Sequence, residues 1–415
     1  MSAKFQVPRG THDVLPSEQP LWQLVTGTLA EVAELYGYRR IQTPNFEDTE
    51  LFLRTSGSGS DVVQKEMYTF EDRGGRSLTL KPEGTAPVAR AYLEHGMHRE
   101  PQPVKLYTVA PMYRYAAPQK GRYREHWQCS VEAIGSDDPA IDAELIQLYT
   151  EFARRVGITQ YELQLNSIGD AACRPAYVDR LTQWLDEHTG VLDDDARAKR
   201  ATNPLRVFDV KSPKVREALR AAPTIGDSLC ADCAAHFAEV RRLLDSYGVA
   251  YTVEPTLVRG LDYYTRTVFE FMGPEEKAQS AICSGGRYDG LLEEIGGSPT
   301  PAIGFGAGIE RALIALENEG RTGTAPSLDV FFVVDGNVDG ARASVPPLLA
   351  ELRRAGLSAD TDYARRSFKG QMTQAGRTGA ATVVVVRGDE ATIRRGGRDE
   401  QVVALDQVVA TLTAR

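Results

Sequence analysis

Apolar and polar positions alternate along residues 105–135, KLYTVAPMYRYAAPQKGRYREHWQCSVEAIG, and predict two β-strands joined by a basic loop. The first strand, Leu106 to Arg114, is rich in β-branched and aromatic residues, and the loop, Tyr115 to Gly121, contains turn-forming proline and glycine. The return strand has a period of two, so its polar and apolar residues lie on opposite faces. The polar set is Gln128, Ser130 and Glu132, and the apolar set is Cys129, Val131 and Ala133.

Arginines continue the polar face of this hairpin at its loop end. Arg122, Arg124 and His126 fall on that face if the strand begins early. A face with guanidiniums at one end and an amide and a carboxylate at the other suits a substrate with a phosphate end and a cationic end. The alternative is an ordinary solvated face of an antiparallel sheet.

Helical spacing of apolar residues appears before and after the hairpin. It predicts helices over Ser17–Tyr36, from an N-cap at Thr85, and over Asp142–Val156, with strands at 39–43 and 161–166. Residues 171–251 are helix-rich and charged, and look like an insertion. After a small-residue linker at 321–327, strands and helices alternate to the end of the chain. We therefore expect a domain at 1–325 and an α/β domain at 326–415.

Composition and charge exclude several classes of protein. The 415 residues contain no apolar run long enough to cross a membrane and no signal-peptide core, and the five cysteines are an odd number, which favours reduced thiols in the cytoplasm. The net charge of −9 argues against indiscriminate nucleic-acid binding. Residues from Ser327 onward carry 12 basic and 11 acidic side chains, so the negative charge belongs to the first domain.

Three glycine-containing segments carry residues that bind charged ligands. In Arg259-Gly-Leu-Asp-Tyr-Tyr, the adjacent Tyr263 and Tyr264 point to opposite sides if the segment is extended. Residues 284–289, SGGRYD, form a second glycine turn that offers a cation and an aromatic ring, and Gly304 to Arg311 begins a helix. The last segment lacks the spacing of a dinucleotide fingerprint. The alternatives are tyrosines packed in a core and glycines that allow close packing.

Cysteines and histidines give weaker signals. Cys230-Ala-Asp-Cys233, followed by His236, resembles half a zinc site, but no second CxxC lies at a ligand spacing, so we expect no structural metal. No Ser–His–Asp or Cys–His arrangement stands out among the histidines.

Taken together, these motifs resemble the class II aminoacyl-tRNA synthetases, and among them the histidyl family. Tyr36 to Thr49 resembles motif 1, Tyr113 to Arg124 resembles motif 2, and Gly306 to Arg311 resembles motif 3. The segments LVRGLDYYTRTVFE, SGGRYDGL and PEGTAPVAR resemble signatures of the histidyl enzymes. The resemblance implies an α+β fold: a six- or seven-stranded antiparallel sheet flanked by helices, a helical insertion, and a C-terminal α/β anticodon-binding domain.

The resemblance also implies roles for individual residues. The catalytic arginines are Arg114, Arg259 and Arg311, and the ATP-binding residues are Arg114, Arg122 and Arg311. The histidine-binding residues are Glu83, Thr85 and Gln128 for the α-ammonium group, Glu132 and Tyr264 for the imidazole, and Tyr263 and Tyr288 for the shape of the pocket. ATP accompanied by Mg²⁺ is the implied co-substrate, tRNA(His) the partner, and a homodimer the assembly.

For the tRNA, the resemblance implies contacts from the motif 2 loop, and the charge pattern adds candidates in the C-terminal domain. The candidates on the motif 2 loop are Gln119, Lys120 and Arg124, with Arg122 on the same loop. The candidates in the C-terminal domain are Arg365, Arg366, Lys369 and Arg377. The alternative for the second group is a solvated charged helix.

The chain departs from the family pattern in motif 2. Ala116 stands where the family has a glutamate and Ala117 where it has an arginine, which predicts slower aminoacylation with adenylate formation retained; Lys81 replaces a common arginine, and the region 388–397 is shortened. A second function is therefore possible from the sequence. A non-charging relative, the regulatory subunit of ATP phosphoribosyltransferase, resembles this core and senses histidine. The retained phosphate-binding arginines argue for the ligase.

Overall fold

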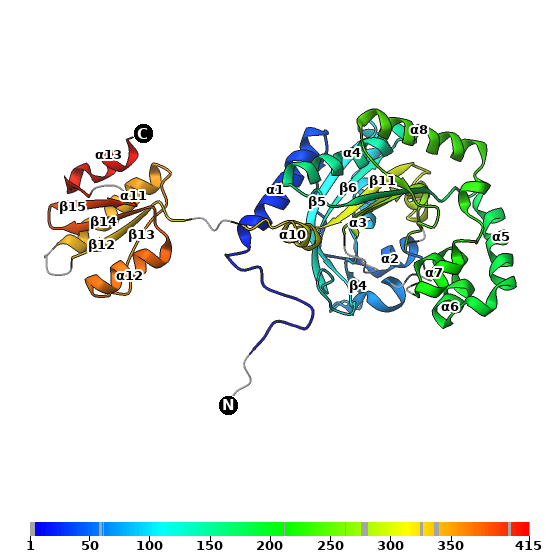
Figure 1. The fold of residues 1–415 in the computed structure, drawn as a ribbon, viewed down its shortest axis with the longest axis horizontal. Helices are drawn as coiled ribbons and strands as arrows, with labels where there is room; N and C mark the ends of the chain where they lie inside the picture. The colour runs from blue at the N-terminus through cyan, green and yellow to red at the C-terminus, as the bar shows by residue number, and fades with distance from the viewer. Residues whose placement is uncertain are drawn as a thin grey trace. The chain divides into compact units, whose positions relative to one another are not determined.

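The computed structural model describes residues 5–57, 60, 62–210, 212–261, 263–274, 281–323, 327–335, 340–396 and 400–414. The chain divides into two compact units, Met1–Gly323 and Thr324–Arg415 (Figure 1). Parts of several predicted segments lie outside the described residues: position 211 of the insertion, position 262 of the RGLDYY segment, positions 324–326 of the linker, and position 397 at the end of 388–397. Positions 58 and 59, in a glycine- and serine-rich stretch at 56–60 that the sequence predicts to be a mobile loop, also lie outside them. The expected boundary at 325/326 also lies outside them.

The first unit combines helices with a large and a small sheet. Its helices are α1 (Gln19–Leu35), α2 (Thr49–Thr55), α3 (Thr85–Glu94), α4 (Pro139–Val156), α5 (Arg174–Glu187), α6 (Asp194–Thr202), α7 (Pro213–Leu219), α8 (Ala231–Tyr247), α9 (Leu291–Glu294) and α10 (Ile309–Asn318). Its strands are β1 (Arg39–Arg40), β2 (Phe46–Asp48), β3 (Tyr68–Glu71), β4 (Ser77–Leu80), β5 (Val104–Tyr113), β6 (Glu125–Ile134), β7 (Glu162–Ser167), β8 (Thr252–Val253), β9 (Thr265–Met272), β10 (Ala281–Arg287) and β11 (Ala302–Gly308).

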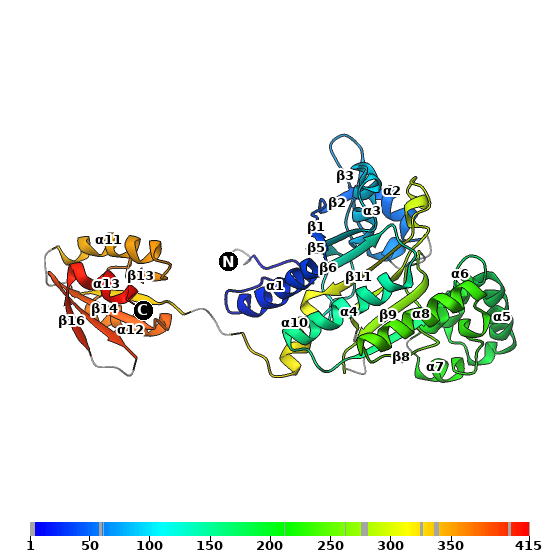
Figure 2. The same cartoon turned by 90° about the horizontal axis from the view of Figure 1, so that it is seen from above.

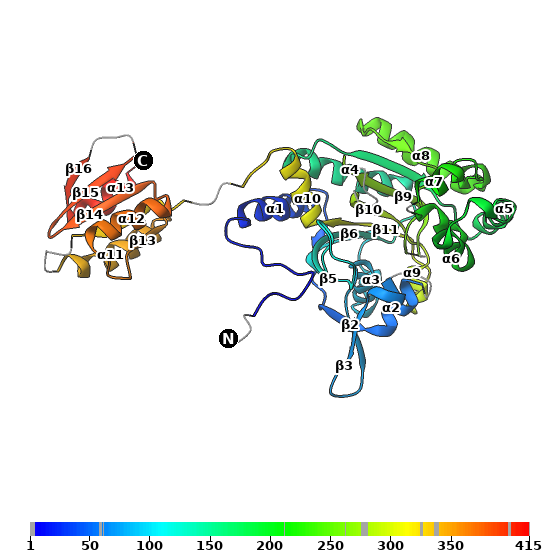
Figure 3. The same ribbon diagram turned by 60° about the horizontal axis from the view of Figure 1, so that its bottom comes forward.

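Among the described residues, the large sheet has eight strands in the order β1-β5-β6-β11-β10-β9-β7-β8. The strands from β5 to β7 in this order pair antiparallel, whereas the two-residue strands β1 and β8 pair parallel with β5 and β7 at the edges. The predicted antiparallel sheet flanked by helices is therefore confirmed. A separate sheet, β2-β4-β3, carries the β3–β4 hairpin, which Figure 3 shows extending from this unit.

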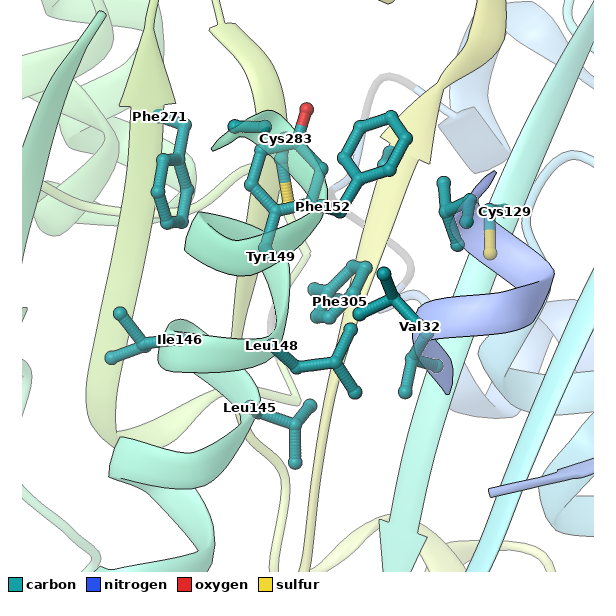
Figure 4. Close-up of a cluster of buried hydrophobic side chains, with 14 of the residues drawn as sticks. Val32, Cys129, Leu145, Ile146, Leu148, Tyr149, Phe152, Phe271, Cys283 and Phe305 are labelled. Atoms are coloured by element: carbon teal, nitrogen blue, oxygen red, sulfur yellow. The ribbon is translucent and has the colours of Figure 1, made fainter. Parts of the chain in front are cut away.

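One face of the large sheet holds the main core. Cys129, Val131 and Ala133 of β6 are buried there together with side chains of α1, α4 and α10, and these three helices lie along the same side of the sheet (Figure 2). Tyr149 of α4 packs its ring 4.6 Å from Phe271 and 5.6 Å from Phe305, between strands β9 and β11 (Figure 4). The apolar half of the predicted alternation is thus the half that packs, and the polar half faces away from this core.

In helix α1, the helical spacing of apolar residues predicts some buried positions correctly and others wrongly. It buries Val25, Leu29, Val32 and Ala33, as the spacing predicts. Leu24 and Leu35, which fit the same spacing, are 42% and 62% exposed, because the buried stripe is narrower than the run of apolar residues. After the helix, Gly37 has φ of 81°, a left-handed conformation that suits glycine and turns the chain toward β1.

The helix-rich segment after β7 contains a small core of its own. Tyr177, Leu181 and Leu185 of α5 pack with side chains that continue as far as Ile225. Helix α8 behaves differently, because its Val240 and Leu244 belong to the main core and its His236 is hydrogen bonded to buried Asp142 of α4 at 2.8 Å. The part of the insertion that packs on itself is therefore shorter than the predicted 171–251.

The second unit is an α/β domain, as its alternating pattern indicates. Its elements are β12 (Val330–Val334), α11 (Ala341–Arg354), β13 (Ala359–Thr361), α12 (Phe368–Thr378), β14 (Thr382–Arg387), β15 (Glu390–Arg395), β16 (Gln401–Ala404) and α13 (Val408–Thr413). Its strands are ordered β13-β12-β14-β15-β16, with a parallel half and an antiparallel half. In neither unit do the described residues include a helix with the length and apolarity needed to cross a membrane.

Candidate functional site

The polar face of the large sheet forms the floor of a deep cleft. The cleft has a volume of about 970 Å³, at the upper end of the range for small-molecule sites. Of the residues expected to bind ligands, those that line it are Glu83, Thr85, Arg114, Arg122, Gln128, Arg259, Tyr263, Tyr264 and Arg311. The hairpin therefore does not present a solvated face: Ser130 and Glu132 are each only 1% exposed.

Glycines on the neighbouring strand make room for the polar side chains of β6. A Cβ atom added to Gly304 would lie 1.8 Å from Oε2 of Glu132, and one added to Gly306 would lie 2.5 Å from Nε2 of Gln128. These glycines belong to β11, and the helix α10 begins only at Ile309, so the prediction that the segment 304–311 starts a helix is wrong for its first half. The glycines allow close packing, and what packs against them is the floor of the cleft.

Glu132 is the buried acid of the site. Its carboxylate accepts hydrogen bonds from Oγ1 of Thr85, at 2.8 Å, and from the hydroxyl of Tyr288. Burial raises the pKa of Glu132 to about 8, against the lowering effect of these two hydrogen bonds. Glu132 and Tyr288 do not themselves line the cavity; they form the layer beneath Thr85.

Glu83 organises the start of helix α3. Its carboxylate accepts the backbone N–H groups of Thr85 and Ala86 at 2.7 and 2.8 Å, satisfying donors that a helix N-terminus leaves free. The N-cap residue is Gly84, and Thr85 is the first residue of the helix, so the prediction of Thr85 as the cap is wrong. Burial raises the pKa of Glu83, against the lowering effects of these backbone donors and of Arg114. This places a second acid beside Thr85.

Tyr263 and Tyr264 lie side by side. Their ring centroids are 4.7 Å apart, both residues are almost fully buried, and both line the cleft. The expectation that they point to opposite sides is wrong, because β9 begins only at Thr265 and the preceding segment is not an extended strand. Tyr263 also contacts Tyr288 edge to face at 5.7 Å, so three phenol rings surround the acid end.

Arginines form the cationic part of the cleft lining. Arg114 donates from Nε to the carbonyl of Pro82 at 2.7 Å, and Arg311 donates to the carbonyls of Gly121 and Ala281 at 3.1 and 2.5 Å. Burial lowers the pKa of Arg311, and the neighbouring charges of Arg122 and Arg114 lower it further. Guanidiniums that repel each other in the empty cleft are stabilised by an anion bound between them.

His126 lies among these arginines at the start of β6. Burial lowers its pKa to about 3, and the charges of Arg114, Arg311 and Arg122 act in the same direction. Its imidazole is therefore neutral at physiological pH and adds no positive charge. Its position on the polar face predicted for the hairpin is the one observed, since it lines the cleft.

Arg259 is held by an acid that the sequence analysis did not identify. Its guanidinium forms an ion pair with Glu270 of β9, and Ser284 donates to the same carboxylate at 3.3 Å. Among the residues that the structure describes, the buried Nε of Arg259 has no hydrogen-bond partner, so this donor is available to a ligand. The ring of Tyr264 lies 5.6 Å from the guanidinium carbon, so Arg259 lies next to the acid–phenol end.

Arg287 does not offer a cation to a ligand, which corrects the interpretation of residues 284–289 as a turn. The segment to Arg287 is the strand β10, and this arginine is fully buried. It pairs with Asp142 at 2.5 Å and with Asp289 at 3.2 Å and donates to the carbonyl of Ser136. Its role is to join β10 to α4.

A second missed residue, Glu66, anchors the motif 2 loop. It pairs with Arg122 at 2.6 Å, and its backbone carbonyl accepts from the N–H of Tyr115. Neither Glu66 nor Glu270 stands out in the sequence, because each lies in an ordinary polar or strand segment far along the chain from its partner. A cation predicted to be buried requires a counter-charge, which is the signal that would prompt a search for both.

The residues expected to contact RNA fall in two places. Gln119 and Lys120 are exposed at a tight turn closed by the backbone bonds between Gln119 and Arg122, while the guanidinium of Arg124 stacks on the Tyr115 ring at 3.8 Å. In the second unit Arg365 and Lys369 are exposed. Arg366 is exposed as well, but it pairs with buried Asp362 at 2.5 Å.

The arrangement can bind a molecule with an anionic and a basic end. Arg114, Arg122 and Arg311 offer charge to phosphate oxygens, whereas the buried acid and the phenols offer hydrogen bonds to nitrogen-bearing groups. Arg259 lines the same cleft and lies beside the phenol ring of Tyr264. Such a cleft suits reactions in which a carboxylate and a phosphate are brought together.

Comparison with known proteins identifies the family. The family model described as histidyl-tRNA synthetase matches residues 10–312. This chain belongs to the histidyl-tRNA synthetase family. A histidine–tRNA ligase of Moorella thermoacetica is 50% identical over 384 residues, which are 92% of this chain and 90% of that protein.

Solved structures agree with the family. The apo histidyl-tRNA synthetase of S. aureus matches with a TM-score of 0.83 and 37% identity, over 99% of this chain and 100% of that one. A structure from Bacillus halodurans described as an ATP phosphoribosyltransferase regulatory subunit/histidyl-tRNA synthetase has a TM-score of 0.65 and 24% identity, over 90% of this chain and 97% of that one. The latter likeness concerns the fold alone.

Proposed function

We propose that the chain activates L-histidine with ATP, forming histidyl-adenylate and pyrophosphate, and then transfers the histidyl group to the 3′ end of tRNA(His). It is an ATP-dependent histidine–tRNA ligase. The observation that carries this proposal is one cleft that is lined by several arginines together with phenol rings, with a buried acid beneath it. Membership of the histidyl-tRNA synthetase family and the 50% identity to a histidine–tRNA ligase support it.

In the proposed activation step, a carboxylate oxygen of histidine attacks the α-phosphorus of ATP, and the bond to pyrophosphate breaks. Arg114 and Arg122 bind the α-phosphate, Arg311 binds the terminal phosphate, and ATP enters with Mg²⁺. Arg259 stabilises the charge on the carboxylate and the α-phosphate as the new bond forms. Its ion pair with Glu270 supports this role, because it fixes the guanidinium before the substrates arrive.

In the proposed histidine complex, Glu83, Thr85 and Gln128 bind the α-ammonium group, and Glu132 and Tyr264 bind the imidazole nitrogens. Tyr263 and Tyr288 shape the pocket. Glu132 lies beneath the lining of the cavity, where it accepts the hydrogen bond from Thr85. A site that satisfies both ring nitrogens discriminates by about 10⁴–10⁵ against analogues that lack them.

In the proposed tRNA complex, Gln119, Lys120 and Arg124 contact the acceptor end, and Arg365, Arg366 and Lys369 contact the anticodon side. Arg365 has φ of 53°, a conformation that is uncommon outside glycine and that clusters at binding sites. Ala116 is buried at the cleft wall. Because this position has no glutamate carboxylate, we expect weaker binding of the tRNA acceptor end.

We also propose that the protein acts as a homodimer through the element Tyr36–Thr49. The exposed apolar side chains near it support this assembly. They include Phe46 on β2, whose ring contacts exposed Phe70 edge to face at 6.4 Å, and Leu53 on α2. Exposed aromatic and aliphatic groups of this kind are typical of surfaces that a partner covers.

Histidine-dependent exchange of pyrophosphate into ATP tests the proposed function. We expect exchange with the purified chain, and we expect Arg259→Ala to bind histidine normally while losing adenylate formation by about 10²–10³-fold, the usual loss when one transition-state donor is removed. Calorimetry measures histidine binding and the exchange assay measures the chemical step. Arg242→Ala is the control, because Arg242 is exposed on α8 and pairs with its neighbour Glu239 on the same helix.

Two outcomes contradict these assignments. Absence of exchange in the unaltered chain would favour the histidine-sensing alternative. Equal losses of binding and exchange in Arg259→Ala would show that this arginine binds the ground state as strongly as the transition state. Because the single variant leaves Glu270 without its counter-charge, Arg259→Ala combined with Glu270→Gln separates that penalty from the loss of chemistry.

A further inference from the structure

A cluster of three cysteines and an aspartate lies outside the cleft. The cluster offers four possible ligand atoms, which all lie within 4.8 Å of one another. They belong to Asp170, Cys173, Cys230 and Cys233. Within the residues that the structure describes, this is the one group of its kind. His236, which the sequence analysis considered beside the CxxC pair, is instead hydrogen bonded to Asp142.

The sequence spacing of the cluster is that of two metal-binding turns. Cys230 and Cys233 are a CxxC pair, and Asp170 and Cys173 are a DxxC pair with the same spacing. The expectation of no structural metal came from the absence of a second CxxC. The folded chain supplies the missing pair with a carboxylate in place of one thiol, and carboxylates are zinc ligands too.

The backbone of each turn directs N–H groups at the sulfur atoms. The N–H of Asp170 lies 3.4 Å from Sγ of Cys173, and the N–H of Cys233 lies 3.5 Å from Sγ of Cys230. Such contacts stabilise a thiolate, the form that binds metals. Gly169 precedes the first turn with φ of 63°, and a Cβ there would lie 2.6 Å from Sγ of Cys173, so the close approach of this turn needs glycine.

The distances suit a small tetrahedral ion. Zinc binds sulfur at about 2.3 Å, which places the sulfur atoms of a tetrahedral site about 3.8 Å apart. The observed limit of 4.8 Å requires only small rotations of the side chains to reach that spacing, and Sγ of Cys173 already lies 3.5 Å from Oδ1 of Asp170.

The charge around the cluster is also suitable. Three thiolates and a carboxylate exceed the charge of one Zn²⁺, so such a site needs a cation nearby. Arg266 supplies it, with Nη2 at 3.6 Å from Oδ2 of Asp170. Its Nε is buried and has no hydrogen-bond partner within the described part of the chain, and its φ of 49° is unusual for an arginine.

We propose that Asp170, Cys173, Cys230 and Cys233 bind one structural Zn²⁺ ion. The ion joins the chain entering the helical insertion, between β7 and α5, to the chain leaving it at the start of α8. Binding displaces the thiol protons into solvent and closes the loop formed by residues 174–229. Restricting such a long loop in the unfolded chain contributes to stability, as a disulfide would.

The site also connects to the cleft through hydrogen bonds to backbone carbonyls, one from a backbone N–H and two from the guanidinium of Arg174. The N–H of Arg266 donates to the carbonyl of Gly169 at 2.7 Å, and Arg174 donates to the carbonyls of Gly169 and Tyr264 at 3.1 and 2.7 Å. Zinc therefore fixes a turn that holds the backbone of Tyr264, without touching any substrate.

Metal analysis of the full chain tests this proposal. Protein produced without a histidine tag, in zinc-supplemented medium and reducing buffer, should contain about one zinc per chain by mass spectrometry. Cys230→Ala and Asp170→Asn should each weaken zinc binding at least about tenfold in competition with a chelator, since even changes around a metal site commonly cost that much. Cys230 is half-exposed, and asparagine keeps an oxygen for the Asp170 turn, so both variants should fold.

Cys129→Ala is the matched control, because it removes a buried cysteine of the main core, and it should retain the full zinc content. A second measurement needs no variant: cobalt added to the zinc-free chain should give the absorption of a tetrahedral cobalt–thiolate site. The proposal is overturned if the reduced chain binds neither zinc nor cobalt, if mass spectrometry finds a disulfide among these cysteines under the same reducing conditions, or if Cys129→Ala loses as much zinc as Cys230→Ala.

Discussion

At the scale of single residues, Glu132 shows how burial sets chemistry. Its carboxyl is 1% exposed, and its partners are the hydroxyls of Thr85 and Tyr288, which carry no charge. Burial without a counter-ion raises its pKa to about 8. A carboxyl group with this pKa holds a proton at neutral pH and can donate a hydrogen bond as well as accept one.

This raised pKa predicts a pH-dependent stability. Between the unfolded pKa of about 4.3 and the folded value near 8, the folded state keeps a proton that the unfolded state has released. The contribution of Glu132 to the free energy of unfolding is fully present below about pH 4.3. It is lost as pH rises to 8, by up to ~1.4 kcal/mol per pH unit. Glu132→Gln removes this slope without histidine present, and urea unfolding at several pH values measures it.

Tryptophan fluorescence reports the unfolding of the first unit in that experiment, because Trp22, Trp127 and Trp184 all lie before residue 324. The surface variant Glu293→Gln is the control and should keep the slope of the unaltered protein. Since Glu310 has a pKa raised to about 7 by burial and is present in all three proteins, its contribution cancels. An unchanged slope in Glu132→Gln would show that Glu132 ionises as it does in water.

At the scale of elements, two neighbouring strands contribute different kinds of residue to the cleft. Strand β6 supplies the polar side chains, and β11 supplies glycines opposite them, in the antiparallel register Gly304–Glu132 and Gly306–Ser130. A strand rich in glycine loses stability from its own entropy. In this protein the glycines of β11 leave the space that the side chains of Glu132 and Gln128 occupy.

Gly306→Ala tests this division. The three atoms nearest to its Cβ would be those at the end of the Gln128 side chain, at 2.5–3.1 Å, so we expect the side chain to move and the strand to remain. We expect KM for histidine to rise about tenfold or more, corresponding to ~1.4 kcal/mol, with KM for ATP changed much less. Gly190→Ala, where a Cβ meets nothing within 4 Å, should leave both values unchanged. Equal changes in both KM values would contradict the assignment of Gln128 to the histidine end.

At the scale of the whole molecule, charge and function are distributed over two units. The cleft lies entirely within the first unit, whose side chains carry the negative charge of the chain. The second unit has nearly balanced charge but exposes basic residues around α12. A polyanion approaching this chain is therefore attracted by local groups and not by net charge.

Arg365→Ala combined with Lys369→Ala tests the second unit in the full chain. We expect KM for tRNA to rise and its dependence on salt to weaken by about 1 in logarithmic slope for each lost phosphate contact, with pyrophosphate exchange unchanged. Arg354→Ala, at the exposed end of α11, is the control. Arg366→Ala should have a smaller effect on tRNA because its guanidinium is already paired with Asp362. A double variant that behaves like Arg354→Ala would remove these residues from the RNA surface.

The local patterns of the sequence predicted most of the elements. The alternation at 128–133 identified the faces of β6, and glycine-rich motifs marked the segments that approach the cleft. Nearly all of the expected ligand-binding residues line that cleft or lie directly beneath it. These features follow from periods of two or 3.6 residues and from turn chemistry, which depend on neighbours in the chain.

The partners of these residues came only from the tertiary structure. Glu270 for Arg259, Glu66 for Arg122 and Asp142 for Arg287 all lie on other elements. The same is true of the DxxC turn that completes the cysteine cluster. The sequence by itself determined which side chains are available and on which face each lies. Which of them meet was decided by strand order and helix packing, because a contact between distant segments depends on the geometry of everything folded between them.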